Sequence, residues 1–487
     1  MSTTYSRRAS DASNVTFAKQ PAADDWFLDG LTWFVGGIVH VLAGIPVLGL
    51  SVIAAGVSVW WSRERGGLLP LVGLGLLVAA LVALRFFAPR VFEMVVGDPV
   101  ISSWRKTLLF ERWWQPAMVC SGLAYRPGGR QEALPQLRTV HSHRGVGDVR
   151  VRMLPGQTVA DFGAQAEGLA NTFKATDCRV RSVPRKPRYV DLTFIRRDPL
   201  GRKFVAPECP ETVGDLTALP IGVDERSRPA LVPVLYASTL IAGESGAGKS
   251  SAIWAYLAAL APAIRSGLVE IWAIDAKGGM ELAMGRGLFR HVAYGEADGT
   301  AWQGDIADLL DDAVVAMQHR QARLRGVTRK HVPTRAEPLI IVLIDELAAI
   351  TAYVTDNACK KRIVSALGML LSQGRAPGVS VIAATQDPRK EVVQMRDLFT
   401  HRIALRTAEA ETADLVLGDG ARARGAQTHR IAESTPGVAY LVADGQPEPV
   451  RFRFFHLDDT GIASLSDHVR SPLTELRIID DRPQDAA

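Results

Sequence analysis

The chain has 487 residues, more than one typical domain needs, and a formal net charge of +5. That mild basicity fits binding to a polyanion, and it fits equally well positive residues beside a membrane segment. The four cysteines are scattered without a CxxC pair, so the sequence favours neither a disulfide framework nor a zinc site, and it fits a reducing compartment.

Two apolar runs lie near the N-terminus, at Leu31–Trp61 and Leu68–Ala88. Each is long enough to cross a bilayer, which takes about 20 helical residues. The connector at 62–67 is short and charged, so we expect an antiparallel transmembrane hairpin over 31–90 with both chain ends on one side. A polar N-terminal tail at 1–30 precedes it, and a juxtamembrane segment at 91–133 follows it.

Within the juxtamembrane segment, Trp104–Trp114 mixes basic residues with aromatic and aliphatic ones. This pattern fits an amphipathic helix lying against lipid headgroups. It fits a helix packed on a neighbouring domain equally well, and the sequence does not choose between the two.

A small α/β adaptor domain is predicted at 134–215. Polar and apolar residues alternate in Val149–Met153, a helix-like stretch follows at Val159–Thr172, and a second strand-like run is Tyr189–Ile195. Several prolines between 199 and 220 then indicate a linker into the next domain.

The strongest motif is a phosphate-binding loop. A strand-like run at Thr239–Ala242 leads into Gly243–Ser250, which fits GxxxxGK[ST], and a helical stretch follows. In such a loop backbone amides and the helix N-terminus cradle phosphates, Lys249 meets the β- and γ-phosphates, and Ser250 ligates Mg²⁺. The predicted ATP-binding residues are Gly243, Glu244, Ser245, Gly246, Ala247, Gly248, Lys249, Ser250 and Ser251.

A second element supports ATP hydrolysis. Leu339–Ile344 is an uninterrupted apolar run, typical of a central parallel strand, and it ends in Asp345 and Glu346. We expect Asp345 to hold Mg²⁺ and Glu346 to polarise the attacking water.

Further strand-like runs alternate with helices, which predicts a RecA-like doubly wound α/β motor over 216–458, with a polar tail at 459–487. The ligand of such a sheet lies where its strands end. The pair Thr385–Gln386 stands at one of these ends, where Gln386 is a candidate to sense the γ-phosphate; a simple polar strand end is the alternative.

Several blocks in order resemble the FtsK/SpoIIIE/TraB family of DNA translocases, and most of all its conjugative TraB- and TraSA-like members. Besides the two motifs above, the blocks are Ile274–Lys277 with Met280–Leu282, and Gln373–Gln386. The resemblance covers about half of the chain, from Pro220 to Asp458.

This resemblance implies a homo-oligomer, expected to be a hexameric ring, with double-stranded DNA in its channel and ATP sites between subunits. Arg375 is similar to a position implicated in sensing nucleotide across the interface, although a structural salt bridge remains an alternative role. Lys277 matches a family block in which Ala276 replaces a proline, a departure that weakens any claim for Lys277 beyond a structural role.

The expected function is therefore a membrane-anchored, ATP-driven translocase that moves plasmid or integrative-element DNA in conjugation, with other transfer proteins as partners. It would be a multi-pass protein of the cell membrane with its ATPase domain in the cytoplasm. Chromosome partitioning at the division septum is an alternative, but neither its long linker nor its C-terminal winged helix is visible. Type VII protein secretion is another, but such motors usually carry several ATPase modules in tandem.

The sequence does not decide whether two basic clusters contact phosphates or are solvated charges on loops. One comprises Arg320, Arg323, Arg325, Arg329, Lys330 and Arg335; the other comprises Arg422, Arg424 and Arg430.

Overall fold

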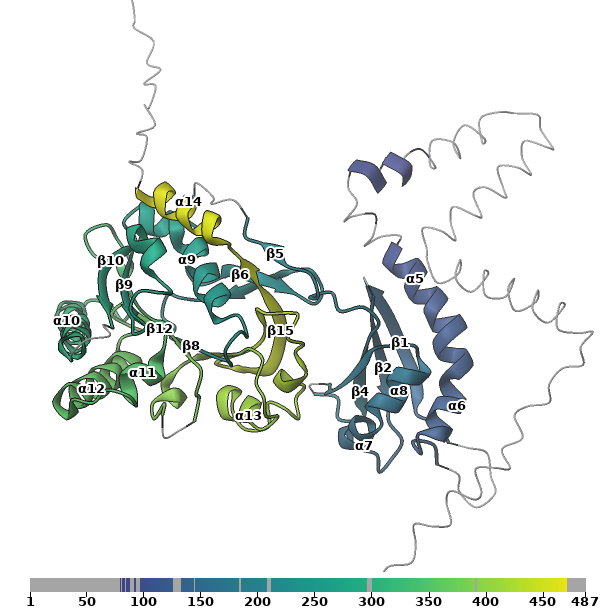
Figure 1. The fold of residues 1–487 in the computed structure, drawn as a ribbon. Coiled ribbons are helices and arrows are strands. Elements are labelled where there is room, and N and C mark those ends of the chain that lie inside the picture. The colour runs from purple at the N-terminus through teal and green to yellow at the C-terminus, as the bar shows by residue number, and fades with distance from the viewer. Residues whose placement is uncertain are drawn as a thin grey trace, which may run out of the picture. The chain divides into compact units, whose positions relative to one another are not determined.

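The computed structural model describes residues 97–470, apart from 126–132, 144, 184, 208–211, 296–299 and 390–391, with a few scattered positions between 79 and 92. These residues fall into two compact units, divided between Arg196 and Arg197 (Figure 1). The predicted membrane hairpin lies outside the described residues, apart from a few helical positions between 79 and 87. Among the helices that are described, none is both long and apolar enough to cross a membrane.

The first unit is built on a four-stranded antiparallel sheet in the order β1-β2-β4-β3. The alternation at Val149–Met153 predicted a strand, and β2 alternates between buried and half-buried residues accordingly. The elements of this unit are α5 (Asp98–Arg105), η3 (Lys106–Glu111), α6 (Arg112–Cys120), β1 (Gln136–His143), β2 (Val146–Arg152), α7 (Val159–Ala164), α8 (Ala166–Thr172), β3 (Asp177–Ser182) and β4 (Tyr189–Ile195).

The continuous helical segment α5-η3-α6 packs on this sheet through aromatic side chains. The Phe110 ring centroid lies 4.8 Å from that of Phe173 and 5.3 Å from that of Phe194. Of the two interpretations of 104–114, this packing favours the adaptor helix for the face that carries Phe110. Trp104 and Trp113 lie on the exposed side.

The second unit contains one large mixed sheet in the order β10-β9-β11-β12-β8-β13-β14-β15-β6-β7, with β5 paired to β15. The six strands from β10 to β13 are parallel, and β14, β15, β6 and β7 are antiparallel to their neighbours. As predicted for Leu339–Ile344, β11 is a fully buried strand between two parallel neighbours.

The strands of the second unit are β5 (Phe204–Val205), β6 (Leu219–Asp224), β7 (Pro229–Val232), β8 (Thr239–Ala242), β9 (Val269–Asp275), β10 (Phe289–Tyr294), β11 (Leu339–Ile344), β12 (Val379–Thr385), β13 (His401–Ala404), β14 (Val438–Ala443) and β15 (Gln446–His456). Its helices are α9 (Lys249–Arg265), η4 (Ala283–Leu288), α10 (Ala301–Leu324), α11 (Leu347–Thr351), α12 (Asn357–Gln373), η5 (Arg396–Leu398), α13 (Thr412–Leu417), η6 (Thr428–Arg430) and α14 (Asp459–Arg470).

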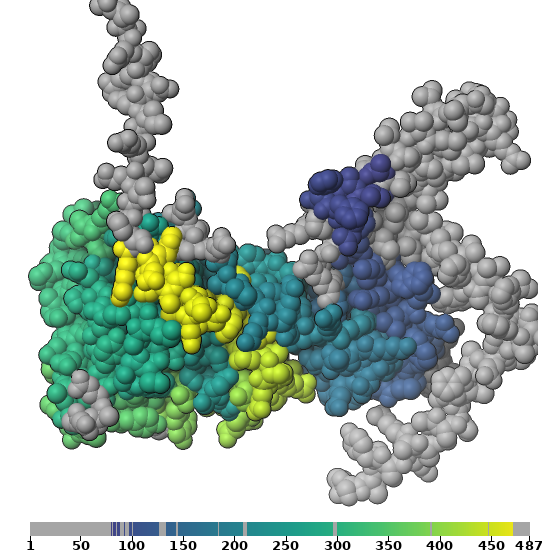
Figure 2. Space-filling model, turned by 45° about the horizontal axis from the view of Figure 1, so that its top comes forward, coloured from purple at the N-terminus to yellow at the C-terminus, as the bar shows by residue number. Residues whose placement is uncertain are grey.

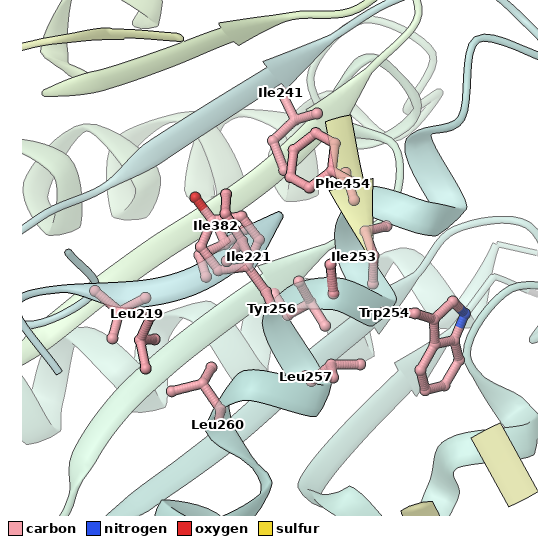
Figure 3. Packing of buried hydrophobic residues seen from close by; sticks show 14 of the residues in the cluster. Leu219, Ile221, Ile241, Ile253, Trp254, Tyr256, Leu257, Leu260, Ile382 and Phe454 are labelled. Atoms are coloured by element: carbon pink, nitrogen blue, oxygen red, sulfur yellow. The ribbon is translucent and has the colours of Figure 1, made fainter. Parts of the chain in front are cut away.

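Helices cover both faces of this sheet, which gives it two separate cores. On one face, α9 inserts Ile253, Tyr256, Leu257 and Leu260 between strand residues such as Ile241 (Figure 3). On the other face, α10 and α12 pack on each other and on the buried sides of β11 and β12. The helix after the P-loop is therefore fixed to the sheet along much of its length.

The boundaries of the second unit differ from those of the domains predicted from the sequence. The second unit begins at Arg197 rather than after 215, since β5 pairs with β15 at its start. Residues 459–470, where a polar tail was expected, form α14, which lies across the surface of the unit (Figure 2). Ile462 and Leu465 are spaced to share one helix face, and both are buried against the α9 core.

His331 shows how tightly the loop before β11 is packed. Its side chain is 2% exposed, and its Nε2 lies 3.0 Å from the carbonyl oxygen of Glu337. Since a carbonyl only accepts, Nε2 carries the proton in this contact. Burial, and then the charges of Arg320 and Arg323, lower the pKa of His331 to about 4.

We expect protonation of His331 to destabilise the fold in acid. Because its folded-state pKa of about 4 lies below its ordinary value of 6.5, the unfolded chain binds more protons below pH 6.5. The free energy of unfolding then falls as the pH drops from 6.5 toward 4, with a contribution of ~1–2 kcal/mol lost by pH 5. His331→Gln keeps an N–H donor and should lose that much less between pH 7 and pH 5, as measured by urea unfolding. Equal losses for both proteins would contradict this.

Candidate functional site

The P-loop joins β8 to α9 at the carboxyl edge of the parallel strands. Gly246 and Gly248 have φ angles of +73° and +102°, a region that favours glycine. A Cβ on Gly248 would lie 2.3 Å from the backbone nitrogen of Gly437. Gly437 also donates its N–H to the Ala247 carbonyl at 2.8 Å. The loop before β14 therefore presses directly on the P-loop, and only glycine fits at 248.

Lys249 lies over the P-loop. Its Nζ donates to the carbonyl oxygens of Gly243 at 2.9 Å and Glu244 at 2.8 Å. Burial lowers the pKa of Lys249 to about 8, against the opposing effect of the Glu346 carboxylate. Ser250 and Ser251 follow on the first turn of α9.

Asp345 and Glu346 follow β11 and are 2% and 6% exposed. Asp345 Oδ1 accepts from the Ala276 backbone N–H at 2.9 Å, and Glu346 Oε1 accepts from the Gln386 backbone N–H at 3.0 Å. Burial raises the pKa of Asp345 to about 6, although Lys277 works against this. The second oxygen of each carboxylate has no hydrogen-bond partner within the described structure.

Lys277 faces both of these carboxylates. Its Nζ lies 3.5 Å from Asp345 Oδ2 and 3.4 Å from Glu346 Oε2. Burial lowers its pKa, but Asp345 and Glu346 outweigh this and the net pKa is raised. The sequence weakened any claim for Lys277 beyond a structural role. In the structure, Lys277 is the cation that faces both Asp345, the predicted Mg²⁺ ligand, and Glu346, the predicted residue that polarises water.

Asp275, at the end of β9, positions Lys277. It is fully buried, and its Oδ1 accepts from the Lys277 N–H at 3.0 Å. Its Oδ2 accepts from the N–H groups of Glu281 and Leu282 at 3.1 and 2.9 Å. The block 274–282 is thus folded around one carboxylate. The sequence signal that could have indicated this role is Asp275 itself, an acid at the end of a strand-like run.

Arg406, after β13, is a residue that sequence reasoning missed. Its Nη1 lies 2.9 Å from Glu244 Oε2, and its Nη2 donates to the Ser245 carbonyl at 3.4 Å. The Arg406 carbonyl also accepts from the Glu244 N–H at 3.1 Å. The chain after β13 therefore fixes the first half of the P-loop.

Gln386 and Arg375 lie near opposite ends of β12. Gln386 follows β12 beside Glu346, to which its backbone N–H donates, and its side chain is exposed. Arg375 precedes β12, at the amino edge of the parallel strands and away from the P-loop of its own subunit. Its side chain is exposed and forms no ion pair with any residue of the described chain.

Arg375 borders a cavity of about 570 Å³ that two further arginines, Arg402 and Arg424, also line. Arg402 lies 3.8 Å from Asp397, and Arg424 donates to the Asp419 carbonyl at 3.0 Å. Of the three guanidinium groups, that of Arg375 is the least engaged within the described part of the subunit.

The two basic clusters are largely engaged within the protein. Arg320 is 7% exposed and donates to the carbonyls of Pro338, Pro377 and Gly378. Arg323 pairs with Glu337, and Arg335 donates to the Ser266 carbonyl at 3.1 Å.

In the second cluster, Arg422 pairs with Glu411 at 2.8 Å. Arg320, Arg323 and Arg422 therefore have partners within the protein, whereas the sequence left their role open between phosphate contacts and solvated loop charge.

Two families match the chain. Residues 214–448 match the FtsK/SpoIIIE family, and residues 81–196 match the actinomycete conjugal transfer protein N-terminal domain. The second match ends at the residue where the first structural unit ends.

Individual relatives agree with these matches. Protein Tra of Streptomyces lividans is 24% identical over 456 residues, which cover 85% of this chain and 64% of that protein. The chain thus spans less than two thirds of the length of this relative. Transfer protein TraSA of Streptomyces ambofaciens is 26% identical over 352 residues, which cover 67% of this chain and 79% of that protein.

Among solved structures, the pCW3 conjugation coupling protein TcpA, in its monomer form with ATPgS, is 17% identical with a TM-score of 0.46. The similarity covers 69% of this chain and 93% of that chain. The resemblance found in the sequence is confirmed by the two family matches. The chain therefore contains a P-loop ATPase domain of the FtsK/SpoIIIE family, preceded by an N-terminal domain of the actinomycete conjugal transfer type.

Proposed function

We propose that the chain is an ATP-driven translocase of double-stranded DNA that acts in conjugal transfer. The observation that carries this proposal is the combination, in one chain, of an FtsK/SpoIIIE ATPase domain with the N-terminal domain of actinomycete conjugal transfer proteins. The relatives named for transfer support the same role. The apolar runs at 31–90 would anchor the chain in the cell membrane as a multi-pass protein, with the ATPase domain in the cytoplasm.

Magnesium fits the residues present at the site. Asp345 Oδ2 and Glu346 Oε2 are buried oxygens without a hydrogen-bond partner in the described structure, and Mg²⁺ prefers oxygen ligands. Ser250 and Asp345 would hold the ion, which would neutralise charge on the phosphates. Glu346 would orient the attacking water through Oε2, while the Gln386 N–H holds Oε1 in place.

Lys277 would act as a positioning residue for hydrolysis. Its ammonium, between the two carboxylates, keeps both of them aimed at the same point near the P-loop. Lys249 would bind the phosphates themselves.

The ring assembly extends the proposal to Arg375. In a ring that places Arg375 against the neighbouring P-loop, its unengaged guanidinium would stabilise charge on the neighbour's γ-phosphate. The exposure of Arg375 and its distance from its own P-loop along the strands support this role.

The first prediction concerns coupling to DNA. The purified chain should hydrolyse ATP several-fold faster with linear duplex DNA than without it. Lys249→Ala should lose ATP binding, whereas Glu346→Gln should keep binding and lose about 10²–10³-fold in kcat, since only the base is removed. Stimulation by a secreted protein and not by duplex DNA would exclude DNA as the cargo. Hydrolysis by Lys249→Ala would remove the site assignment.

The second prediction concerns Lys277. Lys277→Met leaves two buried carboxylates without their facing cation, so kcat should fall by about tenfold or more while the affinity for ATP stays within about threefold. Lys277→Arg should keep more activity than Lys277→Met. Steady-state ATPase assays and titration with a fluorescent ATP analogue separate the two effects. An unchanged kcat in Lys277→Met would show that the ammonium has no part in hydrolysis.

The third prediction tests Arg375 by mixing inactive variants. Arg375→Ala and Lys249→Ala should each be inactive alone. If Arg375 acts on the neighbour, a mixed ring contains interfaces that pair an intact P-loop with an intact Arg375, so mixing should restore ATPase activity. A mixture no more active than the sum of its parts would assign Arg375 to its own subunit.

A further inference from the structure

A group of polar side chains lies in the first unit, where α5 runs beside β1 (Figure 1). Ser102 fixes the helix to the strand, because its Oγ accepts from the Ser142 N–H at 2.7 Å. Arg105 stands three residues further along α5, and therefore on the same helix face as Ser102.

A second arginine enters the group from β4. Arg196 follows that strand, and its backbone N–H donates to the Gly145 carbonyl at 2.9 Å. Its guanidinium carbon lies 5.8 Å from the centroid of the Phe110 ring, and its Nη2 donates weakly to the Phe173 carbonyl at 3.4 Å. The Arg196 side chain is thus held over the aromatic core of the unit.

Gly147 lies against two of these polar groups. A Cβ built on Gly147 would lie 3.3 Å from Arg196 Nη1 and 3.7 Å from Ser142 Oγ. Both polar atoms therefore border the place where any other residue would have a side chain.

Three donors in this group lack a partner. Arg105 Nη1, Arg196 Nη1 and Ser142 Oγ are all buried, and none has a hydrogen-bond partner in the described structure. Ser142 itself is only 2% exposed. Buried polar groups are nearly always hydrogen-bonded in native proteins, so three orphaned donors at one location point to a missing acceptor.

The charges lead to the same conclusion. Burial lowers the pKa of Arg105, while burial and then the charge of Arg105 lower the pKa of Arg196 to about 10. No carboxylate of the described chain is among the groups that act on either pKa. Two like charges, partly removed from water and close to each other, are unfavourable until an anion joins them.

We propose that Arg105, Arg196 and Ser142 form a binding site for a phosphate group. Two guanidinium groups and a hydroxyl supply several N–H and O–H donors, which match the oxygens of a tetrahedral oxyanion. The phosphate has two possible sources with the same chemistry: a free phosphate, or the headgroup of an anionic phospholipid, since the sequence that precedes α5 is rich in apolar residues. The site is separate from the ATPase site and does not depend on ATP hydrolysis or DNA translocation, whereas the lipid source rests on the membrane anchor proposed above.

The test uses inorganic phosphate and the full chain in detergent, on a Lys249→Ala background that removes phosphate binding at the P-loop. Phosphate at 10 mM, compared with sodium chloride of equal ionic strength, should raise Tm by at least ~2 °C. Arg105→Gln/Arg196→Gln should abolish this shift. Arg188→Gln, which removes an exposed arginine from the same unit, should leave it unchanged.

Two further readouts keep the test decisive. Gly147→Ala should weaken the phosphate shift while both arginines remain, because its methyl group would lie 3.3 Å from Arg196 Nη1 and crowd that donor. Without phosphate, the double variant should be at least as stable as its parent, since it removes two uncompensated buried charges. A double variant that is destabilised without phosphate, together with a parent that shows no phosphate shift, would make the arginines purely structural.

A lipid arm identifies the source. The same proteins are placed in nanodiscs of phosphatidylcholine alone or with phosphatidylglycerol. A Tm increase that needs phosphatidylglycerol and disappears in the double variant assigns the site to a lipid headgroup. An increase with inorganic phosphate alone assigns it to a soluble phosphate. No increase in either arm overturns the proposal, and the ATPase predictions stand or fall without it.

Discussion

The parallel pairing of β8 with β12, and of β12 with β11, is the constraint on which the ATPase site depends. Parallel neighbours end at the same edge of a sheet, so the loops that follow these three strands must meet. Two hydrogen bonds fix how they meet: the Gly243 N–H donates to the Thr385 carbonyl, and the Gln386 N–H donates to Oε1 of the Glu346 side chain. Residues more than 100 positions apart in the sequence are thereby held within reach of one bound nucleotide.

Burial of these strands is what makes the pairing stable. All residues of β11 and β12 are buried, with α10 and α12 on one face of the sheet and α9 on the other. The same burial sets the electrostatics of the site, because Asp345 and Glu346 are withdrawn from water at the end of a dry strand. Lys277 compensates for part of this cost by placing one positive charge against two negative ones.

Much of this arrangement could be predicted from the sequence, because it depends on local patterns. The glycines of the P-loop, the uninterrupted apolar run of β11 and the acids that end it each have a signature within about eight residues. The contacts of Arg406 with Glu244 could not be predicted, since they join loops far apart in the chain. The order of the antiparallel strands β14, β15, β6 and β7 could not be predicted either, because it depends on which strands become neighbours in the folded sheet. The partners of Arg320 could not be predicted from the charge pattern either, because they are backbone carbonyls, which are the same in every sequence.

The contact between Gly248 and Gly437 has a mechanical consequence. Because the two backbones touch without side chains between them, the start of α9 has no free travel toward β14. The N–H of Gly437 also ties β14 to the Ala247 carbonyl, and Phe454 of β15 donates its N–H to the Gly437 carbonyl at 2.9 Å. These backbone contacts connect the P-loop to β14 and β15, so a displacement of the loop would be transmitted to the antiparallel half of the sheet.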